Sequence, residues 1–346
     1  MPEPKLSFAV AILNWNGVHW LRQFLPAVIQ HTPQARIYVI DNASTDESIT
    51  VLQNEFPQLT LIQNTANTGY AGGYNTGLQS VTEDIIVLLN SDIEVTPGWL
   101  QPFITAFTED PALGAAQPKI KDFNNKSHFE YAGAAGGFMD ILGYPFCRGR
   151  IFDHLEEDNG QYDTPMEIFW ATGACMVARK TAYQQAGGLN QVLFAHMEEI
   201  DLCWRMRNLN YSIKVLPQSV VYHVGGGTLN KISPQKTFLN FRNNLIIIML
   251  NMPSASSFFI ILTRLLLDGI AALKFLADGQ PKHLVAVLKA HFSFYGLMPR
   301  LMLERNKKAK PLKNLPGVYK RSIVWDYFSM RKKEFSKLPV QDKSNI

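Results

Sequence analysis

Short apolar runs rich in β-branched residues alternate with longer segments of helical period over the first third of the chain. The apolar runs cover residues 8–13, 37–40, 59–62, 85–89 and 114–120, and the helical segments between them cover 20–29, 46–56, 72–81 and 99–107. Such alternation is typical of βαβ units built around a mostly parallel sheet. The capping residues Ser44 to Glu47 agree with the helix start that they precede. The pattern therefore predicts an α/β fold, with a mostly parallel sheet flanked by helices.

The pattern of apolar and polar residues changes after residue 120. Residues 121–165 have no clear period, and we expect them to form a long excursion over the sheet. Residues 168–177 and 213–223 are expected to be further strands, on either side of a helix from about 196 to 208.

Three predominantly apolar helical segments follow, at residues 238–250, 258–275 and 283–303. Charged residues such as Arg264 and Asp268 interrupt them, so none offers eighteen clean apolar residues. We expect an amphipathic helical hairpin that lies in a membrane interface or against the main domain. The predicted division is a catalytic domain at 1–235, with a nucleotide half at about 1–120 and an acceptor half at about 121–235, and an amphipathic helical region with a basic tail at 236–346.

Composition and charge narrow the class of protein. Of the 346 residues 47% are hydrophobic and 18% charged, which excludes a disordered chain. The net charge of +4 is unevenly spread, because residues 300–346 carry +9 and the rest of the chain −5. The basic clusters at 305–310 and 331–333 predict contact with a membrane surface, with a solvated tail as the alternative. Nucleic-acid binding is not expected, because no nucleic-acid motif accompanies the basic residues.

The cysteines and the N-terminus favour a cytoplasmic protein. Cys147, Cys175 and Cys203 are too few and too widely spaced for a disulfide framework or a zinc knuckle, which favours a reducing compartment. The apolar run at 8–13 is short and lacks a small-residue cleavage site. We interpret it as a buried strand and not as a signal peptide.

Polar side chains follow three of the predicted strands, where ligands bind in sheets of this kind. They are Asn14 and Asn16 after the first run, Asp41 after the second, and Asn90, Ser91 and Asp92 after the fourth. A carboxylate at a strand end is suited to reading a nucleobase or ribose hydroxyls. Asp92, on a turn, is suited to holding Mg²⁺ or Mn²⁺ against a diphosphate, although a capped turn is the alternative for this tripeptide.

The segment from 67 to 77 lies between these strand ends in the sequence. Its glycines, Gly72 among them, allow close approach of the backbone to a bulky ligand, with Asn75 beside them. The chain lacks both GxGxxG after the first strand and a P-loop, so neither a dinucleotide fold nor a P-loop is supported.

A second polar cluster lies at the start of the predicted helix from 196. Glu198 and Glu199 are adjacent and point about 100° apart, so only one can face a given pocket. Asp201 and Arg205 have i,i+4 spacing and can pair. Acidic residues in a first turn are also good capping chemistry, which is the alternative. His223 ends a predicted strand and precedes three glycines, where a metal or phosphate could approach.

Together these motifs resemble the family-two inverting glycosyltransferases of the GT-A fold, especially the branch labelled rhamnosyltransferases of bacterial cell-surface polysaccharide assembly. The resemblance runs in order through about residues 7–245. Its motifs lie at 14–17, 39–46, 67–77, 89–92, 170–175, 198–205, 223–228 and 241–243.

The resemblance implies a role for each motif. Asp41 would read the nucleobase with Asn14 and Asn16 nearby, and Gly72, Asn75, Asn90 and Ser91 would complete the donor site. Asn90-Ser91-Asp92 would be a variant Asp-x-Asp motif in which Asp92 binds Mg²⁺ or Mn²⁺, with His223 as a second ligand. Trp170, Gly173, Ala174 and Asp201 would shape the sugar or acceptor pocket. The catalytic base would be Glu199 or Glu198, where the second residue departs from the family's usual Asp.

The resemblance also implies the partners. We expect a metal-dependent hexosyltransferase that moves a sugar from a dTDP- or UDP-linked donor to a glycan or polyprenyl-linked acceptor, at the inner face of the cell membrane. Two alternatives stay open at this point. A sugar nucleotidyltransferase would want a Gly-rich basic loop after the first strand, which residues 14–17 do not supply. A membrane-associated assembly subunit would carry a degenerate transferase domain.

Overall fold

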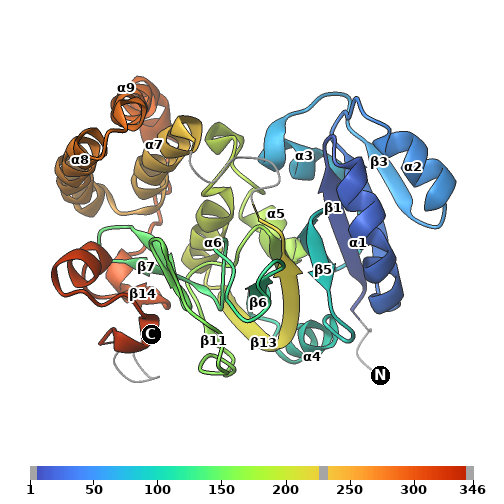
Figure 1. Cartoon of the computed structure of the whole chain (residues 1–346). Helices are drawn as coiled ribbons and strands as arrows, with labels where there is room; N and C mark the ends of the chain where they lie inside the picture. The colour runs from blue at the N-terminus through green and yellow to red at the C-terminus, as the bar shows by residue number, and fades with distance from the viewer. Residues whose placement is uncertain (1–5, 226–232, 340–346) are drawn as a thin grey trace.

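A central sheet runs through the molecule with helices on both faces (Figure 1). The computed structural model describes residues 6–225 and 233–339. The order of the sheet is β11-β13-β6-β12-β4-β1-β2-β3, and β5 pairs with β13. Its strands are β1 (Phe8–Asn14), β2 (Arg36–Asp41), β3 (Thr60–Gln63), β4 (Ile85–Asn90), β5 (Ile93–Val95), β6 (Leu113–Asp122), β11 (Met166–Glu167), β12 (Cys175–Arg179) and β13 (Ser212–His223).

The nucleotide half is the parallel part of this sheet, as the alternating pattern predicts. Strands β3, β2, β1 and β4 pair in parallel. Both faces are covered: Val10 and Ile12 of β1 pack with one set of helices, and Ala9 and Ala11 pack with the other. The helices of this half are α1 (Val18–His31), α2 (Ser48–Glu55), α3 (Gly69–Gly77) and α4 (Gln101–Glu109).

The acceptor half adds antiparallel pairing. Strand β12 is antiparallel to both β4 and β6, while β13 is parallel to β6. The single strand expected at 168–177 is wrong, because residues 168–174 leave the sheet between β11 and β12. Ile168 N still donates to Ile213 O of β13, but Phe169 N donates to Gly137 O, outside the central sheet. Helices α5 (Lys180–Gln185) and α6 (Glu198–Asn208) cover this half, close to the expected bounds of the latter.

The aperiodic segment at 121–165 contains a second, small sheet that the sequence did not reveal. Its strands are too short for a period to show, and their order is β10-β9-β8-β7-β14. They are β7 (Gly137–Asp140), β8 (Pro145–Cys147), β9 (Arg150–Ile151), β10 (His154–Leu155) and, from the C-terminal segment, β14 (Val318–Tyr319). The C-terminal segment therefore folds back on the acceptor half, where Phe335 packs against Phe138 and Phe146.

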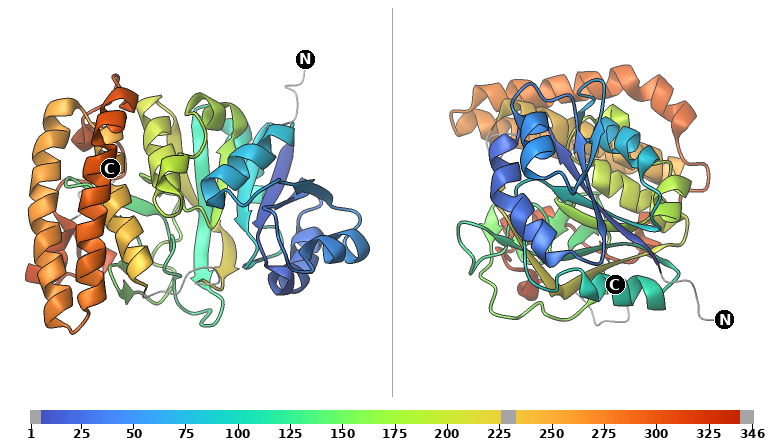
Figure 2. Two further views of the ribbon diagram at one scale, coloured as in Figure 1. Left: turned by 90° about the horizontal axis from the view of Figure 1, so that it is seen from above. Right: turned by 90° about the vertical axis from the view of Figure 1, so that its right-hand side faces the viewer.

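Three long helices form the helical region, at α7 (Pro234–Asn251), α8 (Ser254–Ala277) and α9 (Pro281–Glu304). Helix α7 lies between the sheet domain and the α8–α9 pair (Figure 2). On α8 the charged Arg264 and Asp268 are buried, while Leu266 and Ile270 are 68% and 64% exposed. This distribution is the reverse of a helix that packs its apolar face on a core. Among the described helices, none is long and apolar enough to cross a membrane.

Candidate functional site

The carboxyl ends of β1, β2 and β4 lie side by side and bring the polar strand ends together. Asn14 is in register with Asp41, and Leu13 with Asn90. The two loops beyond β1 and β2 are tied to each other, because Asn16 Oδ1 accepts a hydrogen bond from Thr45 N at 2.7 Å. We call this surface, formed by residues 14–17, 41–46 and 90–92, the donor edge.

Asp41 lies on the buried side of the donor edge. Its carboxylate is completely buried and accepts hydrogen bonds from Ser44 N at 2.9 Å and Asn14 Nδ2 at 3.1 Å. The carboxylate therefore braces the loop between β2 and α2. Its role as the reader of a nucleobase stays a prediction.

Asp92 of the donor edge forms a buried row with His223 and Glu130. His223 Nε2 lies 3.2 Å from Asp92 Oδ1, and His223 Nδ1 lies 3.2 Å from Glu130 Oε2. Burial alone would lower the pKa of His223, but the charges of Glu130 and Asp92 outweigh it and raise the pKa to about 10. Glu130 thus fixes the ring from the side opposite Asp92, as carboxylates do for metal-binding histidines.

The donor atoms of Asp92 and His223 fit a divalent ion that is shared with a substrate. A carboxylate oxygen and an imidazole nitrogen meet at 3.2 Å, and both are ligand types for Mn²⁺ once the ion displaces the proton from His223 Nε2. Within residues 6–225 and 233–339, no group of three or more His, Cys, Asp or Glu side chains is arranged to hold a metal ion. Mg²⁺ and similar ions are often bound by one or two protein groups together with phosphates and water. The pair therefore suits an ion that completes its shell with a diphosphate.

Glu198 and Glu199 begin α6 on the acceptor side. Each has a buried carboxylate oxygen without a hydrogen-bond partner in the described structure. Burial, and then the charge of Glu199, raises the pKa of Glu198 well above its usual value. Burial raises the pKa of Glu199 to about 7, although backbone N–H groups of the helix start act in the opposite direction. A carboxylate with a pKa near 7 is suited to general base catalysis at neutral pH.

Helix α7 holds the loop that precedes these glutamates. Phe194, His196 and Met197 have φ angles of 63°, 66° and 75°, which residues other than glycine seldom adopt. Asn243 is fully buried, and its Nδ2 donates to the carbonyl oxygens of Leu193, Ala195 and His196 at 2.8–2.9 Å. These contacts fix a strained loop and with it the start of α6.

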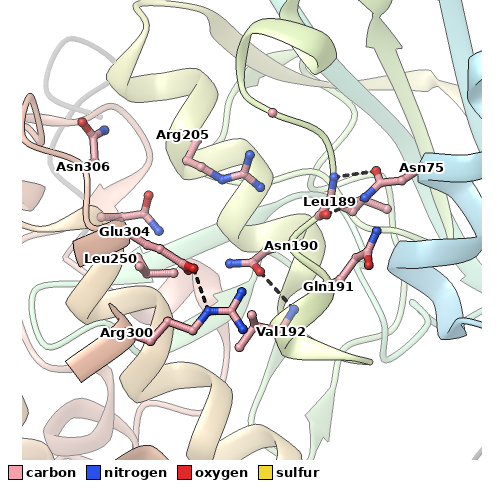
Figure 3. Close-up of a pocket in the computed structure, with 12 residues that line it drawn as sticks. Asn75, Leu189, Asn190, Gln191, Val192, Arg205, Leu250, Arg300, Glu304 and Asn306 are labelled. Carbon is pink, nitrogen blue, oxygen red and sulfur yellow. Dashed lines mark hydrogen bonds and ion pairs between the residues drawn. The ribbon is translucent and has the colours of Figure 1, made fainter. Parts of the chain in front are cut away.

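Two residues that we expected at the donor site lie elsewhere. Asn75 points away from the donor edge, and its side chain binds the backbone of Leu189 and the hydroxyl of Tyr183. It lines a separate pocket of about 450 Å³ between the 187–192 loop and the ends of α7 and α9 (Figure 3). Gly72 is buried inside α3, where an added Cβ would lie 2.5 Å from Thr68 Oγ1. The glycines of α3 therefore allow close approach of protein to protein, since a Cβ at Gly77 would meet Ile40.

The residues that we expected around the sugar or acceptor pocket lie in different places. Gly173 lies beside the glutamates, because a Cβ there would lie 3.7 Å from Glu199 Cβ, and its carbonyl accepts a hydrogen bond from Tyr70. Trp170 is buried, and its Nε1 donates to Phe138 O of the small sheet. Ala174 is buried and its carbonyl pairs with Asn90 N. Asp201 is fully buried between Arg205, at 2.7 Å, and Asn251, at 2.7 Å, so it ties α6 to α7.

The sequence pattern does not predict Glu130 as a residue of the site, and it predicts no role for Asn243. Glu130 comes from the aperiodic segment, where neither a motif nor a period marks it. Asn243 belongs to the 241–243 motif, which was the available signal. Residues 226–228 of the glycine segment after His223 lie outside the described residues.

Comparisons with known proteins agree with this arrangement. The family model "Glycosyl transferase family 2" matches residues 9–186. The chain is 25% identical over 233 residues to the N-acetylglucosaminyl-diphospho-decaprenol L-rhamnosyltransferase of Mycobacterium tuberculosis, covering 62% of this chain and 74% of the relative.

Two solved structures share the fold. The first is the mannosyltransferase PcManGT from Pyrobaculum calidifontis with GDP-Man and Mn²⁺, at a TM-score of 0.52 and 14% identity, covering 85% of this chain and 88% of that one. The second is GalNAc-T7 with UDP, GalNAc and Mn²⁺, at a TM-score of 0.57 and 17% identity, covering 72% and 48%. The expected GT-A fold is thus confirmed. The chain belongs to glycosyltransferase family 2.

Proposed function

We propose that this glycosyltransferase moves a sugar with inversion from a nucleoside-diphosphate donor to a lipid-linked glycan, with help from a divalent ion. The observation that carries the proposal is that the site contains carboxylates in two different environments. Asp92 pairs with His223 at the donor edge, and on the acceptor side Glu198 and Glu199 each have one buried carboxylate oxygen without a hydrogen-bond partner in the described structure. A relative at 25% identity that is named for a diphospho-decaprenol acceptor and a rhamnosyl donor supports this substrate class.

Glu199 is the proposed base. A pKa of about 7 lets its carboxylate ionise at neutral pH, whereas burial and the charge of Glu199 raise the pKa of Glu198 well above its usual value and disfavour the ionised form of that group. Glu199 would take the proton of the acceptor hydroxyl as the hydroxyl oxygen attacks the anomeric carbon. The bond from that carbon to the diphosphate breaks, and the nucleoside diphosphate leaves from the opposite side. A single displacement of this kind inverts the anomeric carbon and leaves no covalent sugar on the enzyme.

The donor edge and the Asp92–His223 pair would hold the leaving group. When bound, Mg²⁺ or Mn²⁺ supplies positive charge that stabilises the departing diphosphate. Asp92 and His223 would hold the ion, with Glu130 orienting the imidazole. The loops at 14–17 and 41–46, braced by Asp41, would receive the dTDP or UDP moiety, with Asn90 and Ser91 at its diphosphate end.

Turnover of a donor panel tests the reaction. The purified protein is incubated with a lipid-linked glycan, Mg²⁺ or Mn²⁺, and UDP- or dTDP-sugars, and release of nucleoside diphosphate is measured. We expect release with one donor class, loss of release with EDTA, and a fall of about 100-fold or more in Asp92→Asn. Release of pyrophosphate would indicate a nucleotidyltransferase instead. No binding or turnover of any donor would favour a non-catalytic assembly subunit.

We further propose that the α8–α9 pair docks on the inner face of the cell membrane. Seven apolar side chains of α8 are more than half exposed: Phe258, Phe259, Leu262, Leu266, Ile270, Leu273 and Leu276. Exposed Leu288 and Phe292 continue this surface on α9, with Lys282 and Lys289 beside them. An apolar stripe with flanking cations is suited to an anionic lipid surface.

Vesicle sedimentation tests this docking. Leu266→Glu with Ile270→Glu should lower binding to phosphatidylglycerol-containing vesicles by about 10-fold or more, because two exposed apolar groups that the membrane would bury are lost. Leu209→Glu, an exposed apolar residue outside α8 and α9, is the control. Unchanged vesicle binding, or a stable dimer that the double variant dissociates, would contradict the proposal.

A further inference from the structure

Arg150, at the start of β9, is an inward-facing arginine with few hydrogen-bond acceptors. Its Nη1 donates to Phe152 O at 3.1 Å and its Nη2 to Cys147 Sγ at 3.6 Å. Its Nε is buried and has no hydrogen-bond partner in the described structure. No ion pair formed within residues 6–225 and 233–339 includes Arg150.

Three other inward-facing arginines each have a carboxylate, whereas the buried Arg148 bonds only to backbone carbonyls and the Met166 sulfur. Arg205 pairs with Asp201 at 2.7 Å, Arg207 with Glu167 at 2.6 Å, and Arg264 with Asp268 at 3.7 Å. A guanidinium keeps its charge in proteins, and a charge that is largely removed from water needs an opposite charge or a full set of acceptors. Arg150 has two acceptors, one of them a sulfur atom. The charge of Glu130 acts on Arg150 without a direct bond, and the unpartnered Nε–H can still bind an anion supplied from outside the chain.

Tyr131 holds Arg150 and a second cation in one place. The guanidinium carbon of Arg150 lies 4.3 Å from the centre of the Tyr131 ring, and Lys236 Nζ lies 5.3 Å from it. Stacking on an aromatic face fixes a guanidinium and leaves its N–H edge available for a planar pair of oxygens. The two cations come from β9 and the first turn of α7, so the fold and not the local sequence brings them together.

This cluster lies between the two parts of the proposed active site. Tyr131 directly follows Glu130, whose carboxylate contacts His223. The next residue, Ala132, accepts a hydrogen bond from the Thr172 hydroxyl, and Thr172 precedes Gly173, which lies beside Glu199. The charges of Glu130 and Glu199 both act on Cys147, whose sulfur contacts Arg150. An anion at Arg150 would therefore lie close to both the leaving group and the acceptor.

We propose that Arg150 and Lys236, held against Tyr131, form a phosphate-binding subsite for a diphosphate group. The inference rests on the proposed function, because both the donor and a lipid-linked acceptor carry a diphosphate. Arg150 would bind two phosphate oxygens through its N–H groups, and Lys236 would add a point charge. The chemistry is the same for the two sources, so the experiments must separate them.

Direct binding tests the subsite without turnover. Titration calorimetry with inorganic pyrophosphate in EDTA should show binding by the wild-type chain, and Arg150→Gln should weaken it about 10- to 100-fold, as expected for a lost charge-assisted hydrogen bond. Arg150→Lys should retain part of the affinity. Arg22→Gln, which removes an exposed cation on α1, is the control and should bind as the wild type does. Thermal unfolding of each variant shows whether it is folded.

Kinetics identify the source of the diphosphate. If the acceptor supplies it, Arg150→Gln raises KM for a lipid-diphosphate glycan about 10-fold or more and leaves KM for an alkyl glycoside acceptor unchanged. If the donor supplies it, the variant instead weakens binding of UDP or dTDP by a similar factor. Either result supports the subsite. A folded Arg150→Gln variant with unchanged affinity for pyrophosphate, donor and both acceptors would overturn it, and the proposed transfer reaction would still stand on its own turnover assay.

Discussion

The donor edge and the start of α6 use the same functional group in opposite ways. At the donor edge, Asp46 accepts hydrogen bonds from Val18 N and Ser48 N at 3.0–3.1 Å. Burial would raise its pKa, but these hydrogen bonds outweigh burial and lower it. At the start of α6, Glu199 is buried with an unpartnered oxygen, and its pKa rises to about 7.

This difference separates structural carboxylates from reactive ones. Hydrogen bonds from the backbone stabilise the ionised form and make a carboxylate a weak base. A carboxylate whose backbone hydrogen bonds do not outweigh its burial binds a proton more tightly, which is what proton abstraction from an acceptor hydroxyl requires. The donor edge is thus built to keep its shape, and the start of α6 retains an unsatisfied group for chemistry.

The most direct test of this difference is to remove the charge of Glu199. Glu199→Gln keeps the shape of the side chain and removes the base, so we expect kcat to fall about 10²- to 10⁴-fold. Glu198→Gln is the matched control, because burial and the charge of Glu199 raise the pKa of Glu198 and disfavour its ionised form, so the loss of its charge should cost less. Initial rates with saturating donor and acceptor measure both. A larger loss in Glu198→Gln than in Glu199→Gln would reverse the assignment of the base.

The pH dependence gives two effects of opposite sign. As a base, Glu199 acts only when ionised, so log kcat should rise with a slope near 1 below pH 7 and level off above it. The folded pKa of about 7 lies above the usual value of 4.5, so between these pH values the folded chain binds more protons than the unfolded chain. Stability therefore falls as pH rises from 4.5 to 7.

Glu199→Gln should remove that loss of stability. We expect the variant to be more stable than the wild type at pH 8, by an amount on the order of 1–3 kcal/mol, and to differ little at pH 4.5. Denaturant unfolding at the two pH values measures this. Equal effects of the substitution at both pH values would show that the carboxyl group is not held at a raised pKa.

The two regions also differ in how far the sequence could predict them. Asp41 and Asp92 directly follow apolar strands, and the parallel order of β2, β1 and β4 brings strand ends to one edge, so local patterns were enough. Glu130 and Arg150 come from a segment of two- to four-residue strands with no readable period. Their positions depend on contacts with β13 and α7, which lie far away in the sequence. Asn75 was misplaced because a polar residue after a glycine pair indicates neither which way its helix faces nor what it contacts.

Asn243 offers the smallest test of the same comparison, because it acts on the acceptor side only through the backbone. Asn243→Ala removes a donor from three carbonyl groups of the 193–196 loop, of which Leu193 O keeps Ala195 N and Arg242 Nη2, and we expect about 1–3 kcal/mol of destabilisation. Asn244 is an equally buried neighbour on α7, but its Nδ2 donates to Gly143 O, away from α6. Asn244→Ala should thus destabilise the chain by a similar amount.

Of these two substitutions, only Asn243→Ala should lower the rate of the chemical step. The loop before α6 contains three left-handed residues, and without Asn243 it can relax and displace Glu199, since the start of α6 follows directly. We expect kcat to fall several-fold to about 10-fold in Asn243→Ala. The KM for the donor should not change, because the Asn243 side chain bonds to the 193–196 loop and not to the donor edge. Asn244→Ala should retain kcat. Equal kcat in the two variants, at equal loss of stability, would mean that the loop keeps its shape without Asn243 and that packing around α6 alone positions the base.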